Sequence, residues 1–444
     1  MEMNSYKTIS DAPSSPFLRK ITVLSSMGVM MDGYTLTVFS YALLYLINVM
    51  SLKSYEISIM GISSIGGVLI GSFISGYIAD IYGRRFIYIY DLFLVSIFIF
   101  LTGLATNYIN FSILELIVGI GIGADYPVSS SIQAEFSPTK SRGKFMFFNI
   151  FSFSIGSLIF LGFAVPLVLF TGVNAWRYMY MIGAIFPILV LYSRKKIPES
   201  PYWVQHKYGK VAGEEAKDKF EASTGYSIEN LPEISPGKTR LRDVFKGKYA
   251  AYIIFISIAW FSYDIVSYGI WTYSPLIFST EITSYYADLY VVFTGMAESI
   301  PVVIGFLIAI YYVDRIGRRF LLIIGFLGSF AVLILFFFVN QYMVVGLLMT
   351  FSAFGFVHFF HNVGPSPITY TYPVEIFPTR IRGTAMGFAT SVSRIGSIVA
   401  VFSFPIIDAL YGLKAIIIFF AIFEFIGLAL TLKYAPETKG KALT

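Results

Sequence analysis

The sequence predicts an all-α membrane protein in which twelve transmembrane helices form two pseudo-symmetric six-helix bundles. Three observations predict this fold class: the composition, the number of long apolar runs, and a set of short motifs that occurs twice. Of the 444 residues, 56% are apolar and only 13% are charged, whereas a soluble globular protein carries about 25% charged residues. Most of the surface must therefore face lipid.

Twelve runs of mainly apolar residues are candidates for membrane spans, for which about 20 such residues are needed. The first six cover residues 21–47, 57–79, 86–104, 109–132, 145–170 and 178–191, and the second six cover 250–278, 289–313, 320–339, 343–370, 384–407 and 415–432. One long polar stretch separates the two sets. We therefore expect an N-terminal tail (1–20), a first bundle (21–192), a central loop (193–248), a second bundle (249–433) and a C-terminal tail (434–444).

Three motifs of the first half return in the second half in the same order. The pairs are Gly76–Arg85 with Asp314–Arg319, Glu135–Thr139 with Glu375–Thr379, and Pro198–Ser200 with Pro436–Thr438. From Asp80 to Asp314 the offset is 234 residues, and the other two pairs are offset by 240 and 238. Paired motifs at nearly one offset indicate a duplicated unit. In so apolar a chain, duplication is typical of secondary transporters built from two bundles around a shared path.

The basic residues predict the orientation of the chain. Of its 32 lysines and arginines, only Lys53, Arg177 and Lys414 fall on the odd-numbered loops, and Arg394 falls inside a span. All the others lie on the termini and the even-numbered loops, so the positive-inside bias places both termini and the central loop in the cytoplasm. We expect a multi-pass protein of the plasma membrane. Each basic cluster lies where topology alone requires it, so no nucleic-acid partner is expected.

The motifs of catalysis and cofactor binding are missing from the sequence. It contains no Gly-x-x-x-x-Gly-Lys-Ser/Thr loop, no His-Glu-x-x-His pair and no cysteine, which argues against ATP-driven transport, zinc hydrolysis and thiol chemistry. We therefore expect no enzyme activity, no metal and no cofactor. The expected partners are a small-molecule solute, protons and the lipid bilayer, and we expect a monomer.

The repeated loops predict a gate. In each copy two arginines follow a glycine turn just after an aspartate, and such an aspartate can pair with the arginines and with free amides at the start of the next helix. A cluster of this kind can hold helix ends together in one conformation and release them in another; the alternative is that the arginines serve topology alone. The predicted gating residues are Asp80, Gly83, Arg84, Arg85, Glu135, Arg142, Asp314, Gly317, Arg318, Arg319, Glu375 and Arg382.

The duplicated loop also carries a family resemblance. The Gly-x-x-x-Asp-x-x-Gly-Arg-Arg segment at 76–85, its second copy, and the Pro-Glu-Ser and Pro-Glu-Thr-Lys-Gly segments resemble the motifs of the major facilitator superfamily. The resemblance covers essentially the whole chain and is shared by the sugar porter and phosphate:proton symporter branches. It implies two six-helix bundles in which helices 1, 4, 7 and 10 line a central cavity.

Ionisable residues inside the apolar runs are candidates for function, because charge is costly at bilayer depth. Asp32, Asp125 and Asp264 lie in the first, fourth and seventh runs, and Arg394 is the sole basic residue at depth. Trp260, Asp264 and Tyr268 recur every four residues and so share one helix face. A carboxylate between two aromatic side chains is a suitable anchor for a small polar solute.

Other polar residues of the runs allow a structural reading. His358 and His361 are three residues apart and share a helix face, although a buried neutral histidine that is satisfied by a backbone carbonyl is the common alternative. We expect Glu298 and Glu424 to be structural hydrogen-bonding groups, and Asp91 to join the arginines at 84–85. The glycines at 119, 121 and 123 predict a close approach of another helix backbone.

Residues around the expected cavity resemble the phosphate:proton symporter branch most. The carriers of this resemblance are Asp125-Tyr126-Pro127, the Trp260/Asp264/Tyr268 ladder and Asn362-Val363-Gly364-Pro365. It implies that the aspartates of helices 1 and 4 belong to a proton route and that a basic residue of helix 11 corresponds to Arg394. The expected solute-binding residues are Tyr126, Trp260, Asp264, Tyr268, His361, Asn362 and Arg394.

Three positions depart from that branch. Phe153 replaces a phosphate-contacting glutamine, Thr35 replaces a second aspartate of helix 1, and Glu115 replaces the usual arginine. If Glu115 approaches Asp32, the two carboxylates share a site, and one of them holds a proton near neutral pH. We therefore expect Asp32, Asp125 and Glu115 to be the proton-coupling residues.

Together these features predict a proton-coupled uptake symporter that works by alternating access. The expected solute is phosphate or a small organic anion. A proton-coupled sugar or polyol porter is the alternative, and a non-transporting nutrient receptor on the same scaffold is the second alternative.

Overall fold

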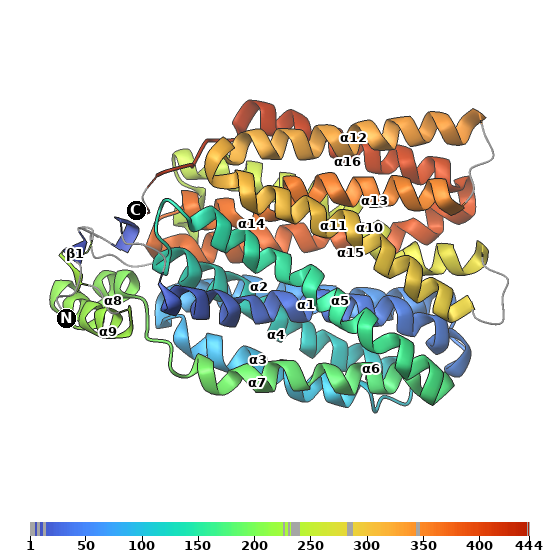
Figure 1. Cartoon of the computed structure of the whole chain (residues 1–444), viewed down its shortest axis with the longest axis horizontal. Helices are drawn as coiled ribbons and strands as arrows, with labels where there is room; N and C mark the ends of the chain where they lie inside the picture. The colour runs from blue at the N-terminus through green and yellow to red at the C-terminus, as the bar shows by residue number, and fades with distance from the viewer. Residues whose placement is uncertain are drawn as a thin grey trace.

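The computed structural model describes residues 5–6, 9–11, 15–224, 227–229, 231, 240–281, 287–342, 347–441 and 443. Long helices run side by side along the longest axis (Figure 1). Both ends of the chain lie at the left of this view, together with the short helices α8 (Pro201–Tyr208) and α9 (Lys210–Thr224). We call this the terminal end of the molecule and the opposite end the distal end.

The first half of the chain supplies six spans. These are α1 (Pro16–Val49), α2 (Ser54–Tyr82), α3 (Arg85–Thr102), α4 (Tyr108–Phe136), α5 (Arg142–Thr171), and a sixth made of α6 (Ala175–Gly183) and α7 (Ile185–Arg194). A 3₁₀ turn, η2 (Gly172–Asn174), joins α5 to α6. Each predicted run of this half therefore falls on a helical span, although the run 86–104 extends two residues beyond α3 and the run 178–191 crosses the break between α6 and α7.

The second half repeats the arrangement. Its spans are α10 (Lys248–Glu281), α11 (Ala287–Ile316), α12 (Arg318–Tyr342), a fourth made of α13 (Leu347–Val363) and α14 (Pro365–Ile376), α15 (Arg382–Tyr411) and α16 (Leu413–Tyr434). By length and apolarity, ten stretches of the described residues qualify as spans. One of them, Arg142–Arg194, holds two spans, and α13 is too short to qualify without α14. The first four residues of the predicted tenth run lie outside the described residues.

The segment between the halves is folded at the terminal end. Besides α8 and α9 it holds the 3₁₀ turn η3 (Leu241–Phe245) and the strand β2 (Ser227–Ile228). This strand pairs in parallel with β1 (Ser5–Tyr6) near the N-terminus. Of the described part of this stretch, α9 contacts α1 of the first half, whereas η3 contacts α10 of the second half.

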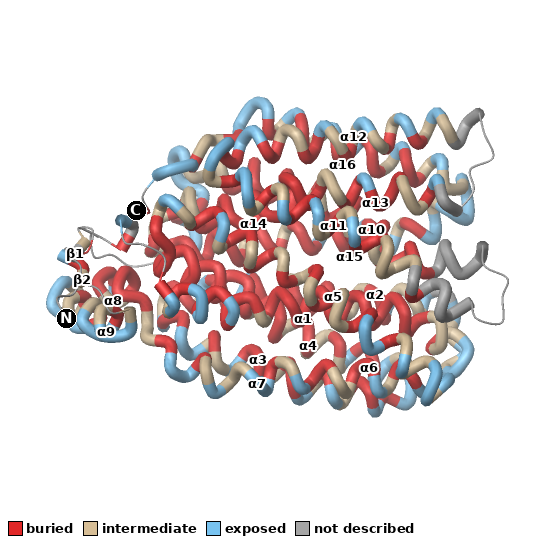
Figure 2. The backbone as a smooth tube through the Cα atoms, in the orientation of Figure 1, coloured by how far each residue is buried: buried red, intermediate tan, exposed pale blue. Residues whose placement is uncertain are grey.

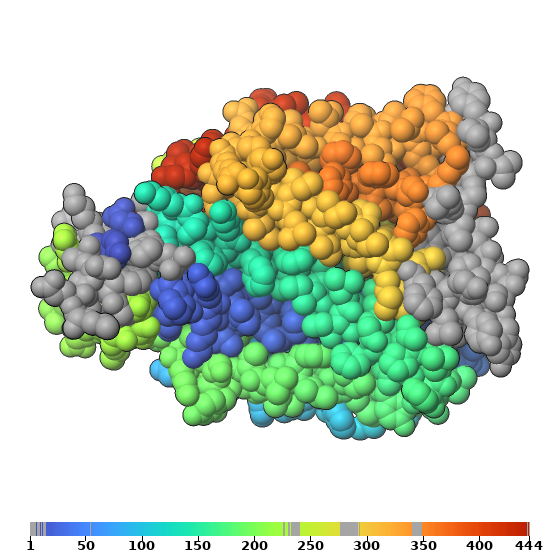
Figure 3. Space-filling model, viewed as in Figure 1, coloured from blue at the N-terminus to red at the C-terminus, as the bar shows by residue number. Residues whose placement is uncertain are grey.

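The two halves pack along a seam. In the space-filling view the first half, from blue to green, lies below the second half, from yellow to red (Figure 3). Across the seam α2 contacts α15, α5 contacts α11, and α1 contacts α10. Residues that line this seam are therefore placed to move relative to one another if the halves rock.

Burial is distributed as expected for a protein in lipid. Buried residues follow the inner faces of the helices and exposed ones the outer faces (Figure 2). Phe86 and Phe170 are 66% and 86% exposed, whereas Asp32, Asp264 and Arg394 are almost fully buried. Large apolar side chains on the outside and ionisable side chains on the inside are the distribution that a lipid environment favours.

Glycines let α2 and α4 cross in backbone contact. A Cβ atom added at Gly119 would lie 2.0 Å from the carbonyl oxygen of Ser64, and one added at Gly67 would lie 2.1 Å from that of Leu116. Small residues at a helix crossing permit such approach in membranes. The predicted close approach at the glycine run of residues 119–123 is thereby confirmed.

A break divides the tenth span in two. At Gly364 the backbone leaves the helical region, with φ −135° and ψ −77°, and Pro365 opens α14 without an N–H that would need a partner. A Cβ at Gly364 would lie 2.2 Å from the carbonyl oxygen of Leu321, so α12 approaches the break closely. The break follows directly after Asn362, one of the predicted site residues.

We predict opposite effects for two glycine-to-alanine substitutions. Gly119→Ala forces α2 and α4 apart and lowers the free energy of unfolding by about 1–3 kcal/mol. Gly162→Ala in α5 meets nothing within 4 Å and raises it by roughly 0.5–1 kcal/mol, because alanine suits a helix better than glycine. The melting temperatures of both variants in one detergent check this, and equal shifts would contradict the crossing geometry.

Candidate functional site

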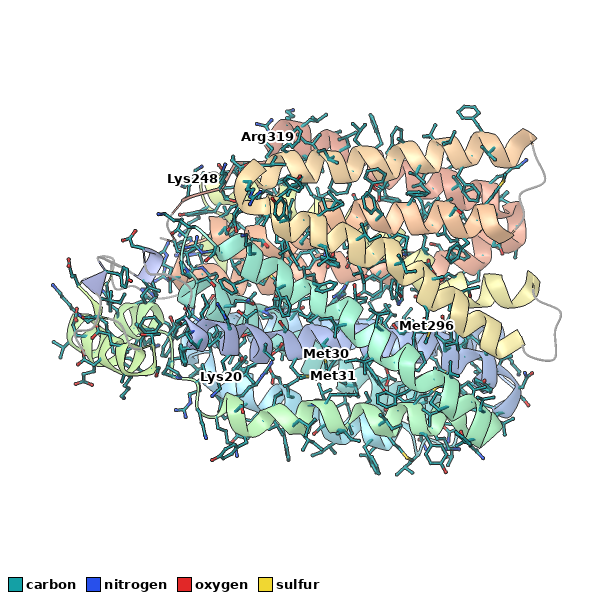
Figure 4. The ribbon with its side chains drawn as sticks, viewed as in Figure 1. Lys20, Met30, Met31, Lys248, Met296 and Arg319 are labelled. Atoms are coloured by element: carbon teal, nitrogen blue, oxygen red, sulfur yellow. The ribbon has the colours of Figure 1, made fainter. Side chains whose placement is uncertain are left out.

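A central cavity lies between the two halves, near the middle of the long helices. Figure 4 labels Met30 and Met31, which precede Asp32, near mid-length of α1. The cavity has about 40 Å³ of free volume between its lining side chains, far below the roughly 300–1,000 Å³ of open small-molecule sites, so its walls lie close together in this conformation. Its polar and aromatic lining includes Tyr126, Phe153, Trp260, Asp264, Tyr268, Trp271, His358, Asn362 and Arg394.

Arg394 of α15 forms hydrogen bonds with residues of both halves. Its Nη1 donates a hydrogen bond to Asp264 Oδ2 (2.9 Å), and its Nη2 donates to Asp32 Oδ2 (3.0 Å) and to the Tyr126 hydroxyl (2.9 Å). Tyr126 in turn donates to Asp32 Oδ2 at 2.6 Å. One guanidinium is thus shared by a carboxylate from each half. With both carboxylates ionised, this cluster carries one excess negative charge.

Several polar atoms of the cluster have no protein partner. Asp264 Oδ1 and Arg394 Nε are buried and accept or donate no hydrogen bond among the described residues. Buried polar atoms are nearly always satisfied in folded proteins. The cavity is therefore equipped to hold a polar occupant.

The aromatic ladder of α10 lines the cavity. Trp260, Asp264 and Tyr268 all contribute to its wall, as their four-residue spacing suggests. The guanidinium of Arg394 lies 4.8 Å from the ring centroid of Tyr268 and 5.2 Å from that of Tyr126. Such cation–π contacts stabilise a buried cation and restrict where Arg394 can point.

Glu115 lies beside the cluster, in a smaller cavity. That cavity is lined by Asp32, Glu115, Tyr268 and Arg394, among other residues. Glu115 is 1% exposed, and its Oε1 has no hydrogen-bond partner within the described chain. The structure therefore brings Glu115 to the same cavity as Asp32, although no direct contact joins their carboxylates.

Asp125 lies away from the central cavity, in a second ionic cluster. Arg194, the last residue of α7, points inward and donates from Nη1 to Asp125 Oδ1 (2.7 Å) and to Asp91 Oδ1 (3.1 Å). Its guanidinium lies 3.9 Å from the centroid of the Tyr88 ring. Asp91 thus pairs with Arg194 and not with the arginines at 84–85. Sequence reasoning missed Arg194 because it ends an apolar run and reads as the first residue of a basic loop.

His361, which the sequence predicts to bind solute, does not line the central cavity. Its Nε2 lies 2.7 Å from Glu424 Oε1 on α16, and Glu424 also accepts a hydrogen bond from Ser329. His358 and Asn362 line the cavity instead. On an α-helix, side chains three residues apart point about 60° away from each other around the helix axis. His358 and Asn362 are four residues apart, so their directions differ less.

At the terminal end, each half caps a helix of the other half. Asp80 of α2 accepts hydrogen bonds from the backbone N–H groups of Gly383 (3.2 Å) and Thr384 (2.7 Å) at the start of α15. Asp314 of α11 accepts from the backbone N–H of Lys144 (3.1 Å) at the start of α5. Carboxylates stabilise the amino-terminal turn of a helix by hydrogen bonding and by the helix dipole. We call these two contacts the cross-caps.

The paired glutamates of the gate have different partners. Glu135 accepts from Arg84 of its own half (3.2 Å) and from Arg382 of the other half (2.5 Å). Glu375 binds Arg318 of its own half at 2.8 Å. Of the two homologous glutamates, Glu135 therefore contributes to the closure between the halves.

The remaining predicted gate residues follow the repeat. Gly83 and Gly317 adopt φ of 107° and 106°, the region that favours glycine. Arg85 and Arg319 each donate to a backbone carbonyl, of Lys195 and Leu432, at 2.8 Å. Arg142 donates to the carbonyl of Lys441 at 3.0 Å and so reaches the C-terminal tail. Figure 4 labels Arg319, with Lys20 and Lys248, at the terminal end.

Glu199 and Glu437, which the sequence presents only as a repeated Pro-Glu motif, also form contacts at the terminal end. Glu199 accepts from the backbone N–H groups of Arg84 (2.9 Å) and Arg85 (3.0 Å), and Glu437 accepts from those of Arg318 (3.1 Å) and Arg319 (3.2 Å). The Pro-Glu motifs thus cap α3 and α12. Their recurrence at one offset was the signal that could have identified this role.

Comparison with known proteins agrees with this architecture. Residues 21–444 match the family model described as "Sugar (and other) transporter". The chain is 30% identical to the Escherichia coli (strain K12) protein YaaU, over 99% of this chain and 97% of that one. It is 27% identical to the inorganic phosphate transporter PHO84 of Saccharomyces cerevisiae, over 96% of this chain and 83% of that one.

A solved structure shares the fold. The proton:xylose symporter XylE from E. coli superimposes with a TM-score of 0.78 at 21% identity, over 96% of this chain and 98% of that one. Because the family model matches nearly the whole chain, the chain belongs to the sugar (and other) transporter family.

Proposed function

We propose that this transporter is a proton-coupled uptake symporter of phosphate or a small organic anion. The observation that carries the proposal is the pairing of one guanidinium with two carboxylates, Arg394 with Asp264 of the central cavity and with Asp32 of the adjoining smaller one. An anion that enters while both carboxylates are ionised meets excess negative charge in a buried site. Protonation removes that charge and leaves the guanidinium free to bind the anion.

Charge balance links one proton to one monoanion. A single proton on the cluster makes it neutral when no solute is bound. After a monoanion binds, a second proton restores neutrality. The cavity must close on one side and reopen on the other while its charge is buried, and this is tolerable only if its net charge stays near zero. Each monoanion is therefore accompanied by one proton.

The residues divide into two groups in this mechanism. Asp32 carries the coupled proton, Glu115 holds a proton in the adjoining cavity, and Asp125 with Arg194 relays charge toward the terminal end. The solute is held by Asp264 and Arg394, with Tyr126, Trp260, Tyr268 and Asn362 around it. The relative PHO84 is an inorganic phosphate transporter, which supports this choice of solute.

A sugar or polyol is the second candidate solute. Phe153 forms part of the cavity wall, and its ring packs edge-on against Trp271 with centroids 5.8 Å apart. An apolar aromatic wall suits the C–H face of a sugar ring better than it suits phosphate. The description of the matched family also names sugars.

Alternating access requires the terminal end to open. We infer that this end faces the cytoplasm, because nearly all lysines and arginines lie on its loops and tails. In the described conformation the cross-caps and Glu135 join the halves there, so the route to the cytoplasm is closed. A ligand that favours the open state shifts the population by its differential affinity for the two states.

Asp32→Asn should uncouple solute movement from protons. Asparagine preserves the shape of the side chain but binds no proton, so accumulation driven by a pH gradient is lost while exchange of internal for external solute persists. Proteoliposomes with radiolabelled phosphate and with radiolabelled glucose check both readouts. Glu56→Gln near the distal end is the matched control. Equal loss of both readouts would remove Asp32 from the proton role, and binding without uptake in the unsubstituted protein would favour a receptor.

Asp264→Asn should weaken solute binding. It removes the carboxyl group whose protonated form hydrogen-bonds the anion, at a cost of about 0.5–1.5 kcal/mol, or roughly two- to tenfold in Kd. Because a ligand of the native state raises the melting temperature, thermal shifts with phosphate, carboxylates and sugars at about pH 5 and about pH 7 measure the change. Asp408→Asn, an exposed position of α15, is the control. An unchanged shift would move the site elsewhere.

Glu135→Gln should favour opening of the terminal end. It breaks a buried ion pair between the halves, which costs about 3–5 kcal/mol, whereas Glu375→Gln breaks the homologous pair inside one half. The chain has no cysteine, so Ser391→Cys, at the buried seam where Ser391 lies 3.0 Å from Ser72, reports opening through its rate of maleimide labelling.

We expect Glu135→Gln to accelerate this labelling and Glu375→Gln to leave it near the rate of the Ser391→Cys parent. Both variants lower the melting temperature, so stability alone does not separate them. Labelling that is equally fast in both would show that Glu135 does not close the seam.

A further inference from the structure

A second pair of titratable side chains lies outside the Arg394 cluster. His358 Nε2 of α13 is 3.9 Å from Glu298 Oε1 of α11. The two residues are 1% and 5% exposed, and neither of these two atoms has a hydrogen-bond partner among the described residues. The other oxygen of Glu298 accepts from Ser274 at 3.1 Å. A buried acid and a buried base therefore face each other with their reactive atoms unpaired.

The pair lies between two cavities. His358 lines the central cavity. Glu298 lines a second one, which we call the distal cavity, with Thr37, Ser40, Tyr41, Ser274 and Ser299 among its walls. Figure 4 labels Met296, two residues before Glu298, nearer the distal end than Met30 and Met31. The distal cavity thus lies on the outer side of the central one.

Trp271 separates the two cavities and lines both. Its Nε1 donates to Thr37 Oγ1 at 3.2 Å, which joins the halves, and its ring packs against His358 with centroids 5.3 Å apart. A solute cannot pass this indole without displacing it. A proton needs only a donor and an acceptor on each side.

We propose that Glu298 and His358 form a proton-binding site that passes protons from the distal cavity to the central cavity beside the Trp271 barrier. The inference rests on the proposed proton coupling and names a route for the proton. It adds a site in the second half to the carboxylates of the Arg394 cluster.

A proton crosses the pair in three steps. Glu298 takes it from a hydronium ion that reaches the distal cavity, which leaves water behind. Its O–H bond then breaks as an N–H bond forms at Nε2 of neutral His358, leaving a carboxylate beside an imidazolium with no change in total charge. The His358 ring then turns so that its Nε2–H bond breaks to a water of the central cavity, which carries the proton away, and the pair returns to its starting state. Transfer requires the two atoms to approach by roughly 1 Å, to hydrogen-bond distance.

The surrounding charged groups fit this assignment. Facing the pair or its cavities are Asp264 and Tyr263 of α10, Arg394 of α15, Tyr41 of α1 and His361 of α13. His361 differs from His358 because its Nε2 is already bonded to Glu424 at 2.7 Å. A satisfied pair of this kind is a structural contact, whereas an unsatisfied pair can exchange protons. Glu424 therefore supplies a matched control.

Infrared spectroscopy of the purified protein in lipid tests the site without any solute. Difference spectra between about pH 5 and about pH 8 report the C=O band of protonated carboxyl groups. We expect Glu298→Gln to remove one titrating band, His358→Gln to shift the pH at which that band titrates, and Glu424→Gln to leave the band in place. A titrating spectrum that Glu298→Gln does not change would overturn the proposal, as would loss of the same band in Glu424→Gln.

Transport separates this proposal from the proposed function. In proteoliposomes with an acidic exterior and radiolabelled phosphate as probe, Glu298→Gln should lose pH-driven accumulation and keep exchange. If the unsubstituted protein accumulates no probe, symport of that solute fails while the infrared result still decides the proton site. If accumulation in Glu298→Gln equals that of the unsubstituted protein, Glu298 is not on the route. Unchanged melting temperatures would show that the variants are folded.

Discussion

The fold is organised around one guanidinium that two carboxylates share in an apolar interior. Arg394 comes from α15, Asp264 from α10 and Asp32 from α1, so the contact joins the two halves at their centre. A buried ion is tolerated only when partners replace its water shell. In the mechanism that we propose, the halves separate only while this central charge stays compensated, so protonation controls the movement.

At the terminal end, carboxylates accept hydrogen bonds from backbone N–H groups at helix starts, both between the halves and within each half. Asp80 and Asp314 each accept from the third residue of a helix in the opposite half, Thr384 of α15 and Lys144 of α5. Within each half, Glu199 and Glu437 cap the helices that follow the glycine turns. The duplicated motifs therefore make two sets of contacts. Those of Glu199 and Glu437 hold each half together, and those of Asp80 and Asp314 join the halves.

Much of this arrangement was predictable from the sequence. Apolar runs located the spans, the paired motifs established the duplication, and the four-residue spacing of Trp260, Asp264 and Tyr268 placed them on one face. What escaped prediction depends on contacts between distant segments. The residues next to Arg194 in the sequence predict a loop, because they do not show that its side chain points inward between α3 and α4.

Rotation about a helix axis was equally hard to predict. A difference of about 60° sends His361 to Glu424 and leaves His358 at the cavity. Nor could the motif distinguish Glu135 from Glu375. Both copies have the same residues, but among the ion pairs that these two glutamates form with described residues, only that of Glu135 with Arg382 crosses the seam. Symmetry in sequence thus conceals an asymmetry in partners.

The reciprocal geometry of the cross-caps has a consequence for how the molecule opens. Because each half supplies the acceptor for one cap and the donor for the other, a rocking motion that lengthens one bond lengthens its counterpart as well. If the cross-caps act as the gate that we propose, partial release is disfavoured and unlatching is a cooperative, all-or-none event. A carrier with this property passes quickly through half-open states, which limits leakage of ions down their gradient during each cycle.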